Sequence, residues 1–281
     1  MKRFLTILTL IMVVALDGFA QQNKQAMAQV NIVSKKERLS DFPTKTLKIV
    51  LPGEDYISMS LREAVKNSWS ISAYEFCGAD EYNRLKENQN YYFMLITKFE
   101  GKNYDGISYL SVVKGGPKSE SKNNELVSMP LCPADEPMGR EGAYMPAILD
   151  VMQNYLERSL SSGFKNITTM VEKAPKAGTM DIVLDENDIP AGLSDKVRQK
   201  KLAGVVRDME GAAEAIRYGS YDTMVGYTIS PASPQAGSVC YRMVFDARNH
   251  AMYYFQKHKI SGSNGRGFLK KDIMKFTKGR K

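Results

Sequence analysis

The sequence predicts an α/β protein of mixed α+β type, built from two tandem repeated modules that each hold a small mixed sheet covered by helices. The first observation is a repeated strand pattern, KIVLPGED at 48–55 and DIVLDEND at 181–188. The second is that similar strand-like and helix-like segments follow each copy in the same order. The third is a nearly constant spacing between matched positions, 133 residues from Ile49 to Ile182. Together these features indicate a diverged duplication, although matched apolar positions also arise by chance.

The composition shift along the chain predicts five segments. Residues 1–20 have a basic start, an apolar run too short to span a bilayer and a small-residue cleavage pattern, as a secretory signal peptide does. Residues 21–44 are polar and form an expected flexible leader. Residues 45–162 form the first module with its closing helix, 163–178 the connector, and 179–281 the second module with a basic C-terminal helix.

The first module opens with a strand that Pro52 and Gly53 stop. Ser60 and Glu63 form a capping-box pattern at the start of a helix, and Asp80 is expected to cap a second one. The expected elements in order are a strand at 47–51, a helix at 60–69, a strand at 72–77, a helix from 80, and strands at 91–99 and 107–114.

A loop rich in Gly, Pro, Ser and Lys at 114–124 separates these strands from the most strongly amphipathic helix of the chain. Its apolar residues recur every three or four positions from Met145 to Leu156, Pro146 suits its first turn and Gly163 suits its end. A helix with this pattern must cover an apolar surface, and we expect it to cover the first sheet.

The second module repeats the order with one predicted difference: a Lys/Arg-rich stretch up to Lys201 replaces the first helix. Gly219 is expected to end a helix in a left-handed cap, and Asp246 to His250 form a hairpin loop. The expected elements are strands at 180–184 and 203–209, a helix at 210–218, strands at 223–230, 238–245 and 251–260, and a final helix that uses Phe268, Leu269, Ile273 and Phe276.

The composition sets limits on compartment and redox chemistry. The formal charge is +8, which indicates a basic protein without the extreme charge of a nucleic-acid-binding tail. The cysteines are Cys77, Cys132 and Cys240, an odd number without a CxxC pair, so a disulfide framework is excluded and either one disulfide or buried free thiols are expected. Cys132 is placed in a loop, MPLCP. No cysteine lies near the expected cleavage site, so a lipid anchor is not implied.

The order of elements resembles the α/β module of TolB N-terminal-like and curli-secretion CsgG-like envelope proteins, and of the penicillin-binding-protein activator lipoproteins. The segments that carry the resemblance are the opening KIVLP and DIVL strands, the short strands around YEF and VVRDM, and the hairpin ending VFDARNH. The resemblance implies an exported envelope protein. The chain also resembles secreted Gram-negative proteins of unassigned function. No lipid-attachment Cys, pore-forming hairpin or propeller repeat accompanies it, so no functional residue is carried over.

The pattern contains no recognisable catalytic, metal or cofactor site. His250 and His258 lie eight positions apart, about 26 Å along one strand, which is too far for joint metal ligation. Cys240 and His258 could meet on adjacent strands, but nothing suggests a third orienting group. Asp55 and Asp188 follow the two equivalent strands and form a weak alternative acidic site, although both also suit helix-leading or turn positions.

Basic clusters and tyrosines provide the candidate interaction surface. Its residues are Lys196, Arg198, Lys200, Lys201, Tyr253, Tyr254, Lys257, Lys270, Lys271 and Lys275. Such a surface suits an envelope protein partner, or an anionic polymer or lipid head groups bound through the basic tail, while solvated helix faces explain the same charges. Nucleic acid is not expected. The segment 261–267 is glycine-rich but lacks the ending of a phosphate-binding loop, and a flexible turn is expected there.

These observations lead to two functional hypotheses. The first is a non-catalytic, exported cell-envelope protein that acts as an interaction or scaffold module, located in the periplasm or at the cell surface. The alternative is a secreted hydrolase with carboxylates in a cleft between the modules. A crevice that holds carboxylates with separated pKa values would favour the enzyme, and an exposed aromatic or edge-strand patch would favour the interaction module.

Overall fold

The computed structural model contains two modules with the same order of strands and helices, which confirms the predicted fold class. It describes residues 39–99, 101, 104–117, 124–163, 166–176, 179–199 and 204–277. The expected signal peptide and most of the expected leader lie outside these residues. The first module holds η1 (Phe42–Thr44), β1 (Thr46–Val50), α3 (Tyr56–Ser68), β2 (Tyr74–Cys77), α4 (Ala79–Leu85), β3 (Tyr91–Lys98), β4 (Ile107–Lys114), β5 (Glu125–Pro133) and α5 (Glu141–Ser162).

The second module follows after a connector that contains the short helix η3 (Ile167–Met170). Its elements are β6 (Asp181–Asp185), η4 (Glu186–Asp188), α6 (Ala191–Arg198), β7 (Val205–Arg207), α7 (Met209–Arg217), β8 (Thr223–Ile229), β9 (Val239–Asp246), β10 (Met252–Lys259) and α8 (Lys270–Thr277). The two sheets have equivalent orders, β2-β1-β3-β4-β5 and β7-β6-β8-β9-β10, with a parallel half followed by an antiparallel half.

Two helices of the first module differ from the sequence-based predictions. Helix α3 begins one turn earlier than the Ser60 capping box because Asp55 caps it, accepting the backbone N–H groups of Ile57 at 3.0 Å and Ser58 at 3.1 Å. Ser60 instead donates its hydroxyl to the Tyr56 carbonyl within the helix. Helix α4 has Gly78 at its N-cap, so the prediction of Asp80 as the cap was wrong.

The fifth strand of the first sheet was the largest omission. No element was predicted at 125–128, and Cys132 was predicted to lie in a loop, MPLCP. Residues 125–133 form β5 instead, and Cys132 is buried in this strand opposite Ser108. Its prolines, Pro130 and Pro133, suggested a loop. Both are compatible with β5 because an edge strand does not need every N–H group for the ladder.

The stretch predicted to replace a helix in the second module also forms one. Helix α6 lies there, with Leu193 and Val197 buried against the second sheet. Phe268 and Leu269, predicted inside the final helix, precede α8 instead. The two modules are therefore more alike than the sequence indicated.

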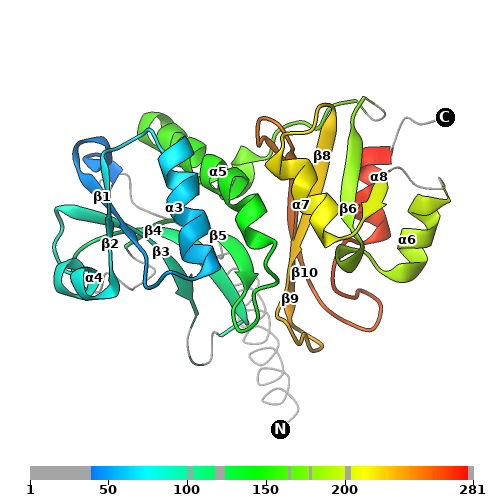
Figure 1. The fold of residues 1–281 in the computed structure, drawn as a ribbon, viewed down its shortest axis with the longest axis horizontal. Helices are drawn as coiled ribbons and strands as arrows, with labels where there is room; N and C mark the ends of the chain where they lie inside the picture. Colours follow the sequence, from blue (N-terminus) through cyan, green and yellow to red (C-terminus); the bar gives the residue numbers. More distant parts are fainter. Residues whose placement is uncertain are drawn as a thin grey trace, which may run out of the picture.

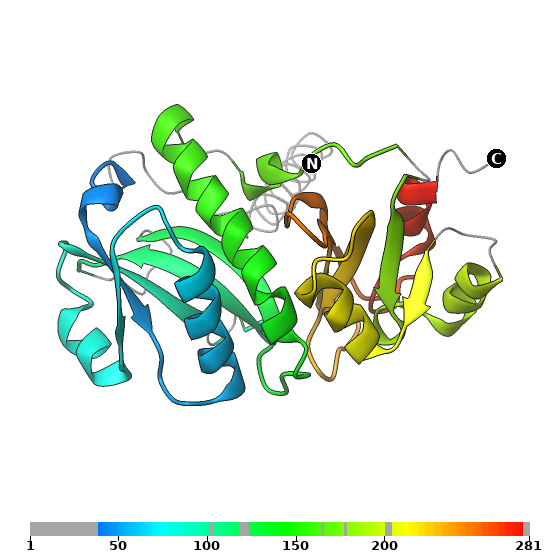
Figure 2. The ribbon, with the colours of Figure 1, turned by 45° about the horizontal axis from the view of Figure 1, so that its top comes forward.

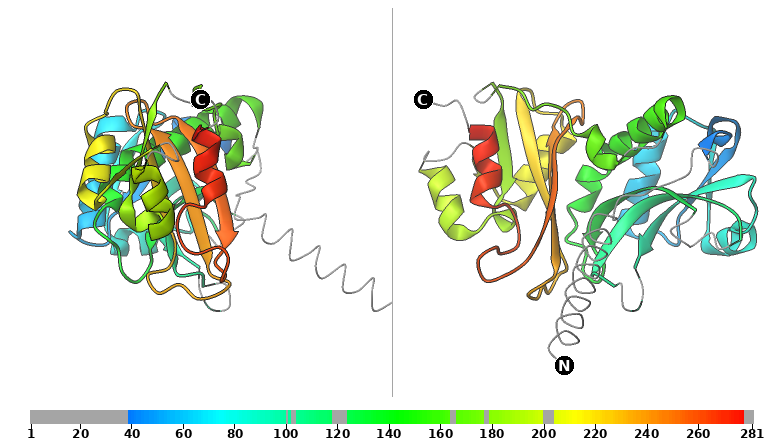
Figure 3. Two further views of the ribbon diagram at one scale, coloured as in Figure 1. Left: turned by 90° about the vertical axis from the view of Figure 1, so that its right-hand side faces the viewer. Right: turned by 180° about the vertical axis from the view of Figure 1, so that it is seen from behind.

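The two modules are stacked in the same orientation, and they do not face each other through equivalent surfaces. In Figure 1, α3 and α5 lie on the side of the first sheet that faces the second module, α7 lies beside them, and α6 and α8 cover the outer face of the second sheet. Figure 2 shows α5 running between the two sheets. The right panel of Figure 3 shows the molecule from behind, with α6 and α8 on the side of the second sheet that faces away from the first module. The largest apolar core is shared, because Ile148 of α5 and Phe245 of β9 belong to one buried cluster.

A buried ion network joins the modules at the start of α5. Arg140 is 3% exposed, and its guanidinium donates to Asp185 at 2.5 Å and to Asp188 at 2.7 Å. It also donates to the Thr228 carbonyl at 2.9 Å and lies over the ring of Tyr227, 5.0 Å from its centroid. Because the guanidinium has several donors fixed in one plane, it sets the orientation of the α5 N-terminus against the second sheet.

Tyrosines and a histidine complete this interface. The ring of Tyr144 stacks on Tyr227 with centroids 4.0 Å apart, and Tyr227 donates its hydroxyl to the Leu131 carbonyl at 2.6 Å. At another point of the interface, His250 Nδ1 lies 2.6 Å from an oxygen of Asp150 on α5. These contacts connect α5 to the second sheet at two separate points.

Replacement of Arg140 by Leu is expected to lower the free energy of unfolding by about 3–5 kcal/mol, because Asp185 and Asp188 would stay buried without their cation. Urea unfolding at neutral pH measures the change. The matched control is Arg158→Leu, an exposed arginine of the same module, for which about 0.5 kcal/mol or less is expected. Equal losses in the two variants would contradict the assigned role of Arg140.

Candidate functional site

A groove runs along β10 and contains part of the predicted interaction surface. It has a volume of about 310 Å³ and three walls, which come from β10, from the connector and from α8. We call it the β10 groove, and its lining residues are Thr168, Val171, Ala174, Tyr253, Tyr254, Phe255, Gln256, Lys275 and Phe276. Of the predicted surface residues, the structure thus brings Tyr253, Tyr254 and Lys275 together.

The two tyrosines of the groove are buried to different degrees. Both pack on the apolar cluster under α8, because a β-bulge lies between Met252 and Tyr254. Tyr254 is 5% exposed and packs under α8, with its ring 5.8 Å from that of Phe276. The prediction that Tyr254 is exposed was therefore wrong. Tyr253 is half-buried and donates its hydroxyl to Asp246 at 3.1 Å, and burial raises its pKa to about 12. Lys275 lies over the Tyr254 ring, 4.8 Å from the centroid.

One buried carboxylate holds α8 in place as the wall of the groove. Asp272 is fully buried, accepts the Tyr254 hydroxyl at 2.5 Å and the Leu269 N–H at 2.7 Å, and forms an ion pair with the buried Arg242. It therefore connects the start of α8 to strands β9 and β10.

The remaining predicted surface residues are distributed around the outer face of the second module. Lys196 and Arg198 are exposed on α6, where Arg198 pairs with Glu186 at 3.1 Å, and Lys270 and Lys271 are exposed on α8. Lys200 and Lys201 lie outside the described residues. Helices α6 and α8 cover the same face of the second sheet (Figure 3), and we call the exposed cations on these two helices the basic face.

Lys257 lies on the opposite face of β10, toward the first module. It is half-buried beside the Tyr241 ring, with Nζ 6.0 Å from the centroid. Burial lowers its pKa, while the nearby charge of Asp105 acts in the opposite direction. Lys257 is therefore a neighbour of the module interface.

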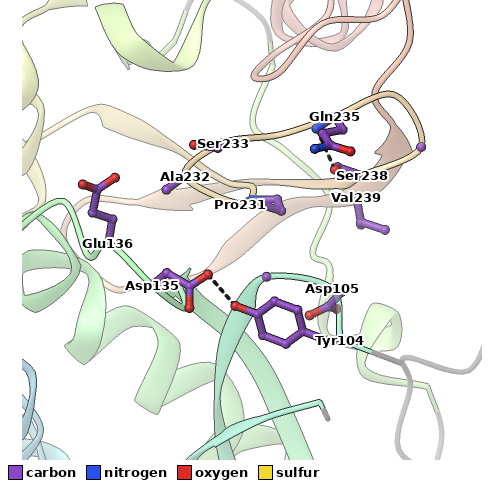
Figure 4. Close-up of a pocket in the computed structure, with 12 residues that line it drawn as sticks. Tyr104, Asp105, Asp135, Glu136, Pro231, Ala232, Ser233, Gln235, Ser238 and Val239 are labelled. Carbon is purple, nitrogen blue, oxygen red and sulfur yellow. Dashed lines mark hydrogen bonds between the residues drawn. The ribbon is translucent and has the colours of Figure 1, made fainter. Parts of the chain in front are cut away.

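Another cavity is a crevice between the modules, with a volume of about 760 Å³. Figure 4 shows its walls, which are formed by the loops after β3 and β5 of the first module and the loop between β8 and β9 of the second. We call it the inter-module crevice. Its side chains include Tyr104, Asp105, Asp135, Glu136, Gln235 and Ser238. A second cavity of about 470 Å³ shares part of this wall and extends to Arg140 and Arg266.

Asp105 is the perturbed acid of the inter-module crevice. Partial burial raises its pKa, although hydrogen bonds from the Tyr109 hydroxyl and from the Ile107 N–H at 3.1 Å favour its ionised form. Nearby, Tyr104 donates to Asp135 at 2.5 Å, and this hydrogen bond raises the pKa of Tyr104. A carboxyl with a raised pKa in a crevice is a candidate general acid.

The acidic pair predicted from the sequence does not form this site. Asp55 caps α3, and the hydrogen bonds from the first turn of that helix lower its pKa. Asp188 is fully buried, where it accepts from Arg140 and from the N–H and hydroxyl of Thr228. Both acids have local structural roles. The acids of the crevice instead come from loops distant in sequence, and no strand pattern pointed to them.

The described histidines and cysteines do not form an activated nucleophile. Cys240 and His258 are opposite each other in β9 and β10, but burial raises the pKa of the Cys240 thiol to about 11, the reverse of activation. Its sulfur accepts the N–H of Gly267 at 3.3 Å, and His258 Nε2 lies 2.8 Å from the Gly265 carbonyl oxygen. All three cysteines, including Cys77, are buried free thiols.

The glycine-rich segment before α8 has a structural role that the sequence did not indicate. Gly267 has φ +87°, and a Cβ atom at this position would lie 2.2 Å from the Asp188 carbonyl oxygen. The Phe268 N–H donates to that same carbonyl at 2.7 Å. The segment therefore packs closely on η4.

The comparisons with known proteins found no match among family models, curated proteins or solved structures. In the described part of the chain, no cluster of three or more His, Cys, Asp or Glu residues is placed to hold a metal ion. No described helix combines the length and apolar character needed to cross a bilayer.

The pH dependence of stability is expected to report on Asp105. Because its pKa in the folded protein is raised, its contribution is fully present below the unfolded-state pKa, about 3.9, and is lost as the pH rises through the folded-state pKa. Asp105→Asn should therefore gain stability relative to the unmodified protein as the pH rises from about 3 to 7, measured by urea unfolding.

Tyr109→Phe is the matched variant with the opposite sign. Its lost hydroxyl no longer favours the ionised carboxylate, so the pH-dependent loss of stability should become larger than in the unmodified protein. Parallel stability curves for the unmodified protein and Asp105→Asn between these pH values would contradict the raised pKa.

Asp272→Ala is expected to cost about 3–5 kcal/mol of stability because it leaves Arg242 buried without a partner. The same replacement at the exposed Asp80 of α4 is the control, with an expected change within about 0.5 kcal/mol. Urea unfolding measures both changes. A loss at Asp272 as small as that at Asp80 would show that α8 does not depend on this anchor.

Proposed function

We propose that this chain is a non-catalytic, exported interaction scaffold of the cell envelope, and that it binds a protein partner through the β10 groove and the basic face beside it. The observation that carries this proposal is the groove itself, where the half-buried Tyr253 and the exposed Lys275 lie along the edge strand of the second sheet. Aromatic side chains next to an unpaired strand edge are typical of surfaces that bind other proteins.

The packing of the modules supports a scaffold more than a closing cleft. The shared core and the Arg140 network fix the second sheet against α5, so a partner would meet a pre-formed surface. A pre-formed surface costs little ordering entropy on binding, which favours recognition without a large conformational change. Export and envelope location are part of the proposal and come from the apolar N-terminal segment of the sequence.

A charge-reversal triple variant, Lys270→Glu, Lys271→Glu and Lys275→Glu, tests this surface. Tagged mature protein captures binding partners from Gram-negative envelope extracts, and quantitative mass spectrometry compares the recovered proteins. We expect the triple variant to recover specific partners at about one tenth of the unmodified level, because the attraction to an acidic partner becomes repulsion.

A second triple variant with the same net charge is the control. It replaces exposed cations away from the groove, Lys66, Arg84 and Arg217, by Glu, and it should capture partners at the unmodified level. Recovery of the same proteins by all three versions, or of none by the unmodified protein, would contradict the proposal. Capture of lipopolysaccharide or lipid in place of protein would assign the basic face to an anionic polymer or membrane surface.

The inter-module crevice favours a second candidate function, a hydrolase in which Asp105 donates a proton to the leaving group. The raised pKa of Asp105 and the volume of about 760 Å³ support this alternative. Asp105 is not a member of the acidic pair, Asp55 and Asp188, that was considered from the sequence.

A panel of chromogenic glycosides, esters, phosphates and peptides tests the alternative. A hydrolase predicts turnover that falls by about 100-fold in Asp105→Asn. The non-catalytic proposal predicts no turnover in either protein. Turnover by the unmodified protein that is lost in Asp105→Asn would therefore replace the scaffold proposal.

A further inference from the structure

The walls of the β10 groove reach the backbone of the strand edge. Four consecutive residues of β10, from Tyr253 to Gln256, line the groove. Side chains alternate between the two faces of the strand after the bulge at Tyr253. A cavity that touches Tyr254, Phe255 and Gln256 must therefore include the edge between those faces. β10 is the last strand of its sheet, so this edge is the one not paired with β9.

The ladder between β9 and β10 shows which backbone groups of β10 face away from β9, in the groove and along the edge that continues beyond it. The Ile260 N–H donates to the Ser238 carbonyl at 2.8 Å, so this pair is of the hydrogen-bonded kind. Hydrogen-bonded and non-hydrogen-bonded pairs alternate along an antiparallel ladder. The N–H and C=O groups of Phe255, Lys257 and Lys259, on the alternate positions, therefore point away from β9.

The connector already adds one strand-like contact at the start of this edge. Its Glu172 N–H donates to the Met252 carbonyl at 2.8 Å. Beyond this contact, Val171 and Ala174 line the far wall and the groove separates the connector from β10. In the described part of the chain, the connector makes one backbone hydrogen bond to this edge, at Met252, and none at the positions that follow.

The charges around the groove favour an acidic occupant. Lys275 forms part of the α8 wall, the exposed Lys173 and Lys176 lie on the connector, and the exposed Lys259 ends β10. Glu172 of the connector is an exposed acid next to Lys173, and its carboxylate oxygen lies 3.9 Å from a guanidinium nitrogen of Arg158. A second copy of β10 would place its own lysines against these, which is unfavourable across a strand pair.

We propose that the β10 groove binds an acidic, extended peptide segment of the partner by strand addition, with its backbone bonded to the outward groups of Phe255, Lys257 and Lys259. The inference rests on the proposed function and names the chemistry of the partner. Backbone bonds supply affinity in this mode, and side-chain pockets such as the one beside Tyr253 supply specificity.

Two variants at one position isolate the backbone bond. Lys257→Pro removes an outward N–H group without removing a bond to β9, whereas Lys257→Ala removes the same side chain and keeps the N–H group. The probe is a fluorescein-labelled peptide of about eight residues, the length of β10, in which glutamate alternates with valine. Fluorescence anisotropy measures its binding, and circular dichroism verifies that both variants are folded.

We expect the peptide to bind the unmodified protein and Lys257→Ala with affinities within about threefold of each other, and Lys257→Pro at least about tenfold more weakly. A lysine–valine peptide should also bind at least about tenfold more weakly than the glutamate–valine peptide. Equal binding to the proline and alanine variants would overturn strand addition, and equal binding of the two peptides would overturn the acidic occupant.

Hydrogen exchange provides a measurement that does not depend on a variant. Saturating glutamate–valine peptide should slow exchange at the amides of Phe255, Lys257 and Lys259 in the unmodified protein. Unchanged exchange at these amides would overturn the proposal, as would their protection in a peptide-free dimer. If Lys257→Pro still captures the envelope partners that depend on the α8 lysines, strand addition fails while the proposed function stands.

Discussion

The relative position of the two modules depends on one buried arginine. Arg140 lies at the start of α5, and its guanidinium is shared between two carboxylates and a carbonyl of the second module. Such a network adds little to stability compared with a well-packed apolar substitute, because three charged groups lose their hydration. Its effect is on geometry. A planar donor satisfies Asp185 and Asp188 together in one orientation only, and the excess negative charge is balanced by donors from Asn187 and Thr228.

The two copies of the module have diverged where they meet different surroundings. On the face of the second sheet turned to α5, Ile229, Met243 and Phe255 are apolar and belong to, or pack against, the shared core. The equivalent positions of the first sheet are Thr97, Ser111 and Ser128. Thr97 is opposite Tyr109 as Ile229 is opposite Tyr241, and Ser128 is opposite Ser111 as Phe255 is opposite Met243.

These three residues form a chain of hydroxyl hydrogen bonds in place of an apolar surface, with Thr97 and Ser111 oxygens 2.8 Å apart. Ser111 and Ser128 are buried, so this face of the first sheet satisfies its hydroxyl groups internally, whereas the equivalent face of the second sheet packs apolar side chains.

Local patterns in the sequence predicted most of the fold and little of the site. The strands from β1 to β4 and from β8 to β10 were predictable because each contains a period-two or continuous apolar pattern within its own few residues. β5 was missed because its prolines indicate a loop unless the strand is known to lie at an edge. Arg140 was missed because its partners are 45 and 48 residues away and only the packed fold brings them together. The same holds for Asp105, whose crevice is assembled from three loops.

Tyr253 and Lys275 were named from the sequence, but the reason for their importance is structural. Their groove exists because Asp272 fixes α8 over β10 while the connector leaves the strand edge after its single contact at Met252. In the first module, the equivalent edge strand β5 instead lies against β8 and supplies Leu131 to the interface. The edge strand of the first module therefore contributes to the contact between the modules, whereas the edge strand of the second module lies beside Lys275 in the β10 groove. Because the two sheets have equivalent strand orders, the second sheet also ends in an antiparallel edge strand, and this edge strand lines the β10 groove.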